Sequence, residues 1–67
     1  MKIYVNDKEH TFKEKELTLG GLLEKINMSS IGVVAELNGE VFNSRDFSTK
    51  SLSDGSRVEL IRIVGGG

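Results

Sequence analysis

Hydrophobic and polar residues alternate near the start of this chain, which is the pattern of a half-buried β-strand. Ile3 and Val5 fall on one face of such a strand, and the polar segment 6–8 that follows is suited to a turn. A second short strand at 10–12 can then return beside the first, with Phe12 on the same apolar face. The beginning of the chain therefore predicts a β-hairpin whose apolar side chains join a core.

The spacing of apolar residues changes to a helical period after residue 18. Thr18 is a suitable N-cap, and Leu17 stands where it can pack on Leu22 as a hydrophobic staple. Gly20 and Gly21 occupy the first turn, where each costs up to about 1 kcal/mol relative to alanine. The helix must therefore depend on tertiary packing. Its apolar stripe follows the i, i+3, i+4, i+7 pattern of an amphipathic helix and consists of Leu19, Leu22, Leu23 and Ile26.

Further strands are expected in the second half of the chain. Asn38–Gly39 is a strong signal for a two-residue hairpin turn, and the segment 41–42 continues on the returning strand. Phe47 is the one large apolar residue of the polar stretch 43–50, and we expect it to cover one end of the core. A tight turn at 54–55 leads to the last strand. The strand before the hairpin alternates inward through Val33, Ala35 and Leu37. The predicted order is β-β-α-β-β-β.

The last strand carries apolar residues on both of its faces. Val58 and Leu60 share one face, whereas Ile61 and Ile63 share the other. A sheet that a helix covers on one side must then show apolar residues on its open side. We predict that Ile61 and Ile63 form a partner-docking surface. The alternative is that they are isolated exposed apolar residues without a function.

Three glycines, Gly65, Gly66 and Gly67, follow this strand. Glycine lacks a Cβ and can pass through a channel too narrow for other residues. We therefore expect a domain at 1–64 and a flexible, reactive tail at 65–67. Gly65 and Gly66 would thread into the active site of a partner, and Gly67 would present an unhindered carboxylate. The alternative is a frayed end without a function.

Length and composition restrict the possible functions. A chain of 67 residues buries little apolar interior, which argues against a self-contained enzyme. It has no cysteine and one histidine, His10, which we place on a strand surface, so no metal site is predicted. The net charge of −1, with scattered basic residues, argues against nucleic acid as a partner. No apolar run is long enough to span a membrane. We expect a cytoplasmic protein that binds other proteins and supplies no catalytic residue.

The segments N-G-E-V at 38–41 and L-S-D-G-S-R-V-E-L-I-R-I-V-G-G-G at 52–67 give the chain a family resemblance. Together with the short length and the order of elements, they resemble the ThiS family of sulfur carriers. The resemblance implies an α+β fold of the ubiquitin-like β-grasp type. In that fold a mixed four- to five-stranded sheet packs on one α-helix, with the first and last strands parallel at its centre. The chain differs from many members at 43–47, where it has neither their proline nor their tryptophan.

The resemblance also implies a chemistry for Gly67. A ThiF-type adenylyltransferase would adenylate this glycine with ATP and magnesium. A sulfur donor such as a cysteine desulfurase would then convert it to a thiocarboxylate. That group would deliver sulfur to a ThiG-type thiazole synthase in thiamine biosynthesis. The chain itself would bind no cofactor or metal.

Other functions remain open from the sequence. A MoaD-like carrier for molybdopterin synthesis uses the same adenylation and a similar Gly-Gly end. A ubiquitin-like modifier would join its end to lysines of other proteins, and a further carrier could serve tRNA thiolation. An adaptor with an inert tail would lose nothing when Gly66 and Gly67 are removed.

Overall fold

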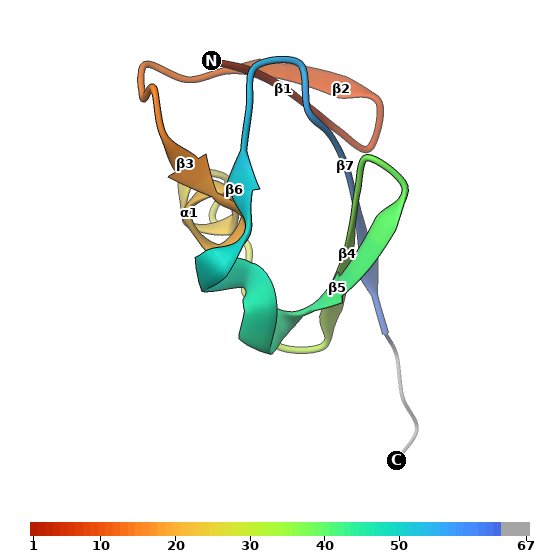
Figure 1. Ribbon diagram of the computed structural model, residues 1–67. Helices are drawn as coiled ribbons and strands as arrows, with labels where there is room; N and C mark the ends of the chain where they lie inside the picture. Colours follow the sequence, from red (N-terminus) through yellow and green to blue (C-terminus); the bar gives the residue numbers. More distant parts are fainter. Residues whose placement is uncertain (64–67) are drawn as a thin grey trace.

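A computed structural model of the protein describes residues 1–63, so the predicted tail at 65–67 lies outside the described residues. The chain folds into a five-stranded sheet, a two-stranded sheet, one α-helix and one 3-10 helix (Figure 1). In chain order the elements are β1 (Lys2–Val5), β2 (Lys8–Thr11), β3 (Leu17–Thr18), α1 (Leu19–Lys25), β4 (Val33–Leu37), β5 (Glu40–Asn43), η1 (Ser44–Thr49), β6 (Ser51–Leu52) and β7 (Arg57–Arg62).

The last strand lies at the centre of the main sheet, whose strand order is β2-β1-β7-β4-β5. β1 and β7 are parallel, with Tyr4 beside Arg57 and Val5 beside Val58, and the other pairs are antiparallel. In Figure 1, α1 and η1 lie on the same side of this sheet. The predicted α+β fold, with a mixed sheet packed on one helix and parallel first and last strands, is confirmed.

Two tight turns close the hairpins. Asn38 and Gly39 both have positive φ, 49° and 91°, as the predicted two-residue turn requires. The first hairpin turns in the same way at Asn6 and Asp7, with φ of 48° and 67°. The turn is therefore one residue shorter than the predicted segment 6–8, and β2 begins at Lys8. The reason is that asparagine and aspartate tolerate the left-handed conformation better than other residues with a Cβ.

The helix begins as predicted. Thr18 is the N-cap of α1, and its Oγ1 accepts a hydrogen bond of 3.1 Å from the Gly21 amide. The side chain of Leu17 lies against this first turn, since a Cβ on Gly21 would stand 3.0 Å from Leu17 Cδ1. Glycine at this position therefore lets Leu17 pack closely on the helix, which offsets part of its low helix propensity. Ile26 is the C-cap and is half-buried.

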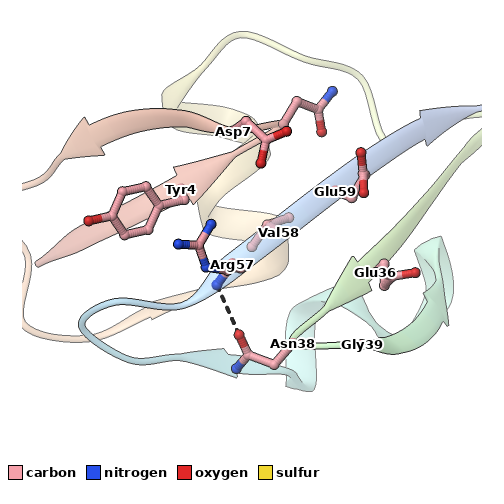
Figure 2. A pocket seen from close by; sticks show the side chains of 9 residues that line it. Tyr4, Asp7, Glu36, Asn38, Gly39, Arg57, Val58 and Glu59 are labelled. Carbon is pink, nitrogen blue, oxygen red and sulfur yellow. Dashed lines mark hydrogen bonds between the residues drawn. The ribbon is translucent and has the colours of Figure 1, made fainter.

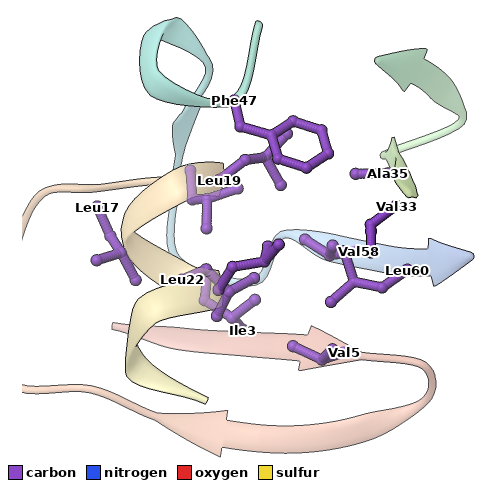
Figure 3. Close-up of a cluster of buried hydrophobic side chains, with 12 residues drawn as sticks. Ile3, Val5, Leu17, Leu19, Leu22, Val33, Ala35, Phe47, Val58 and Leu60 are labelled. Carbon is purple, nitrogen blue, oxygen red and sulfur yellow. The ribbon is translucent and has the colours of Figure 1, made fainter. Parts of the chain in front are cut away.

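The core lies between the main sheet and the helical side of the fold (Figure 3). Phe47 reaches it from η1 and is 2% exposed, which confirms its predicted role at one end of the core. Neither η1 itself nor the small sheet in which β3 pairs with β6 was predicted. Strands of two residues are too short to show a period. The buried hydrophobic residues are Ile3, Val5, Leu17, Leu19, Leu22, Leu23, Val33, Ala35, Phe47, Leu52, Val58 and Leu60.

The structure also bears on the predicted positions of Phe12 and His10 and on the prediction that no segment spans a membrane. Phe12 is half-buried against the core, and the ring of His10 on β2 stacks near it, with 6.1 Å between ring centroids. The prediction that His10 lies on a strand surface is only partly correct, because His10 is half-buried and stands opposite the buried Ile3 in the hairpin. Among the described residues, no helix has both the length and the apolar character needed to cross a membrane.

Candidate docking surface on the open face of the sheet

No element of residues 1–63 covers the face of the main sheet that turns away from α1, and β7 runs through the middle of that face. The two faces of β7, extended by Ile63 just beyond its end, differ sharply in the exposure of their apolar side chains. Val58 and Leu60 are 3% and 7% exposed, whereas Ile61 and Ile63 are 48% and 56% exposed. The predicted division of the last strand into a core face and an open face is therefore confirmed. The docking role of Ile61 and Ile63 stays a prediction.

The strand register adds a third apolar residue to this surface. Val34 on β4 stands directly opposite Ile61. Alternation along β4 turns Val34 away from the buried Val33 and Ala35, toward the open face. Beyond the end of β7, the Ile63 amide donates a 2.7 Å hydrogen bond to the Gly32 carbonyl. We call Val34, Ile61 and Ile63 the apolar end of the open face. Val34 was not predicted as part of this surface, although alternation in 33–37 could have revealed it.

The other end of the open face is polar and forms a shallow hollow of about 270 Å³ (Figure 2). Tyr4 of β1 and Arg57 of β7 lie side by side on its floor, and the Arg57 guanidinium carbon is 4.8 Å from the centroid of the Tyr4 ring. The Arg57 amide donates a 2.9 Å hydrogen bond to Asn38 Oδ1 in the adjoining hairpin turn. The hollow is also lined by Asn6, Asp7, Glu36, Gly39, Val58 and Glu59.

Two glutamates of this hollow stand opposite each other on neighbouring strands. Glu36 of β4 stands directly opposite Glu59 of β7, one step of the open face away from the Val34 and Ile61 pair. The ion pairs formed within residues 1–63 join Lys2 to Glu9 and Lys25 to Glu14. Neither Glu36 nor Glu59 therefore has a basic partner in this part of the chain. Sequence reasoning did not find this pair, because it arises only from the register of two strands.

The structure places Ile61 and Ile63 at exposed positions, and the other predicted site residues stay predictions. Gly65, Gly66 and Gly67 lie outside the described residues. Within residues 1–63, no group of three or more histidine, aspartate or glutamate side chains is arranged to hold a metal ion. What the described residues offer is an exposed sheet face that is apolar at one end and carries two glutamates beside it.

The sheet order, the parallel central strands and the single helix define a β-grasp domain. The chain belongs to the ThiS family, whose model matches residues 2–67. It is similar to a crystal structure of a thiamine biosynthesis protein (ThiS) from Geobacter metallireducens, with 33% identity, a TM-score of 0.85 and full coverage of both chains. A solution structure of a thiamine biosynthesis protein from the same organism has 33% identity and a TM-score of 0.77, over 100% of this chain and 88% of that one.

A curated relative is much longer. A protein of Paramagnetospirillum magneticum named thiazole synthase is 28% identical over 67 residues, which are 100% of this chain and 20% of that protein. The chain thus spans about a fifth of the length of the curated relative it matches.

Proposed function

We propose that this protein is a sulfur carrier in thiamine biosynthesis, and that Gly67 carries the sulfur as a thiocarboxylate. One observation carries the proposal: the match to the ThiS family runs from residue 2 to residue 67 and so includes all three glycines of the tail. The similarity to a solved ThiS over the full length of both chains supports it further. The family match also favours this function over the MoaD-like and modifier alternatives.

The chemistry begins with activation of the Gly67 carboxylate, because a carboxylate anion resists attack by a nucleophile. An adenylating partner of the ThiF type joins this carboxylate to the α-phosphate of ATP, with magnesium bound by that partner, and pyrophosphate leaves. The terminal sulfur of a persulfide then attacks the acyl carbon, and AMP leaves. A thiol reduces the resulting acyl disulfide and releases the thiocarboxylate.

The remaining steps also take place on partners. A cysteine desulfurase would supply the persulfide sulfur, and a ThiG-type thiazole synthase would accept sulfur from the thiocarboxylate. The curated relative named thiazole synthase supports a link to that reaction. The carrier has no cysteine with which to form a persulfide of its own, so its role is to be a substrate.

The open face suits this role because it adjoins the tail in sequence. Gly67 follows Ile63 by four positions, and a fully extended chain of four residues spans at most about 14 Å. A partner that holds Gly67 in its active site must therefore also lie close to Ile63. We infer that Ile61 and Ile63 dock on the adenylating partner while Gly65 and Gly66 pass into its channel.

Intact-protein mass spectrometry tests the proposal. The protein is incubated with a ThiF-type enzyme, ATP, magnesium, a cysteine desulfurase, cysteine and a thiol. We expect a mass gain equal to the exchange of one oxygen for one sulfur atom, located at Gly67. A variant without Gly66 and Gly67 is the matched control and should gain nothing. Absence of any modification, with enzymes that act on their own carrier, would contradict the proposal.

A further inference from the structure

Two neighbouring rows of the open face hold the apolar pair of Val34 and Ile61 and the acidic pair of Glu36 and Glu59. Val41 of β5, which is 61% exposed, stands beside Glu36 in the second row. We propose that the adenylating partner places a basic side chain against Glu36 and Glu59 while an apolar side chain covers Ile61. This inference rests on the proposed function and adds to it a charge that the partner must supply.

The acidic pair is unfavourable in the free protein. Like charges directly opposite each other on one face of an antiparallel pair destabilise the sheet. Nothing in the described part of the chain compensates, because the ion pairs of residues 1–63 leave both carboxylates without a cation. A basic side chain from a partner would bond to both carboxylates and would remove this repulsion.

The other charged residues of the hollow, Arg57 and Asp7, do not neutralise Glu36 and Glu59. Figure 2 shows the Arg57 guanidinium directed toward Tyr4 of β1, away from Glu36 of β4, in agreement with its 4.8 Å stacking distance. Asp7, in the turn between β1 and β2, lines the same hollow and adds negative charge. The surface beside the apolar end is therefore acidic, and charge complementarity requires a basic partner.

The strand geometry fixes the spacing that the partner must match. Glu59 and Ile61 are two residues apart on β7, which corresponds to about 7 Å along the strand. The partner must therefore present a basic and an apolar side chain about 7 Å apart. Gly67 must enter the active site of the adenylating enzyme, and an extended chain from Ile63 to Gly67 spans at most about 14 Å. The body of that enzyme must therefore lie over the open face beside Ile63, so we assign the basic contact to it.

The test measures binding of a ThiF-type enzyme to the wild-type protein and to the Glu36→Gln, Glu59→Gln and double variants. The kinetics are followed by surface plasmon resonance at low and high salt. We expect each single variant to bind at least about threefold more weakly at low salt, mainly through slower association, and the double variant to lose most of the salt dependence. Glu24→Gln is the matched control, because it removes the same charge from an exposed position on α1. This variant should bind the ThiF-type enzyme as the wild type does.

Thermal unfolding separates a binding role from a structural one. Because the carboxylates repel each other, Tm of the glutamine variants should be unchanged or higher by up to about 5 °C. A Tm that falls together with affinity would assign the pair a structural role and overturn the inference. So would affinities and salt dependence equal to those of the wild type. If wild-type Gly67 gains sulfur and the variants still bind normally, only this inference fails and the proposed function stands.

Discussion

The side-chain amide of Asn6 pairs with both backbone polar groups of Leu60. The Leu60 amide donates to Asn6 Oδ1 at 2.7 Å, and Asn6 Nδ2 donates to the Leu60 carbonyl at 3.3 Å. The backbone of β1 leaves the sheet at this point, since Asn6 begins the turn to β2. The amide therefore takes the place of one more residue of β1 and continues the hydrogen bonding along β7.

We predict that Asn6→Gly lowers the free energy of unfolding by about 1 kcal/mol, because glycine tolerates the positive φ but cannot make these two hydrogen bonds. Asn6→Ala should lower it by about 1 kcal/mol more, since alanine is strained at a φ of 48°. Urea denaturation measures both values. Equal stability of Asn6→Gly and the wild type would show that the paired amide adds nothing.

The substitution Ile61→Asp should weaken the complex with the adenylating partner and leave the fold intact, because Ile61 is 48% exposed on the open face. Leu60→Asp is the matched control, since its side chain points to the opposite face and is 7% exposed. That variant should unfold, because a buried carboxylate without a partner costs several kcal/mol. Circular dichroism and a binding assay distinguish the two, and loss of the fold in Ile61→Asp would reverse the assignment of faces.

Gly66→Ala should impair adenylation much more than it alters stability. An added methyl group would meet the walls of a channel that admits only glycine, whereas substitutions away from a core usually change stability by less than about 0.5 kcal/mol. Pyrophosphate release reports the adenylation rate, and thermal unfolding reports the stability. If Gly66→Ala is adenylated at the wild-type rate, the partner's channel is not restricted to glycine at this position.

One carboxyl group gives a prediction about pH. A side-chain hydrogen bond from Lys25 holds the pKa of Glu14 below its ordinary value of 4.5. A carboxyl whose pKa is lowered by folding stabilises the protein above its unfolded pKa, and this stabilisation is lost as the pH falls through the folded pKa. Lys25→Met should therefore destabilise the protein at neutral pH, and the difference from wild type should vanish at low pH.

Nuclear magnetic resonance titration of the Glu14 carboxyl provides the direct measurement. Its pKa should rise in Lys25→Met, and it should rise much less in Lys13→Met, because Lys13 acts on Glu14 only through a weak charge interaction. High salt should reduce both effects, since Lys13 and Lys25 are exposed and Glu14 is only half-buried. An unchanged pKa in Lys25→Met would show that the hydrogen bond does not form in solution.

The local elements of the fold could be predicted because each depends on residues close together in sequence. The N-cap at Thr18 and the hairpin turn at Asn38–Gly39 are examples, since a cap bond and a turn conformation involve only a few adjacent residues. The exposure of Ile61 followed from alternation along one strand. The predicted turn at Asn6 was one residue too long, because the sequence alone does not show which of several adjacent polar residues form the turn.

The sequence by itself determined the helix, the main strands, the two faces of β7 and the glycines that follow it. Only the tertiary structure decided that the Asn6 amide bonds to Leu60, that Leu17 pairs with Leu52, and that Glu36 stands opposite Glu59. These contacts join residues that are far apart along the chain. Their register is set by how the buried side chains of β1, β4, β7 and α1 pack together, and no local pattern of residues records that packing.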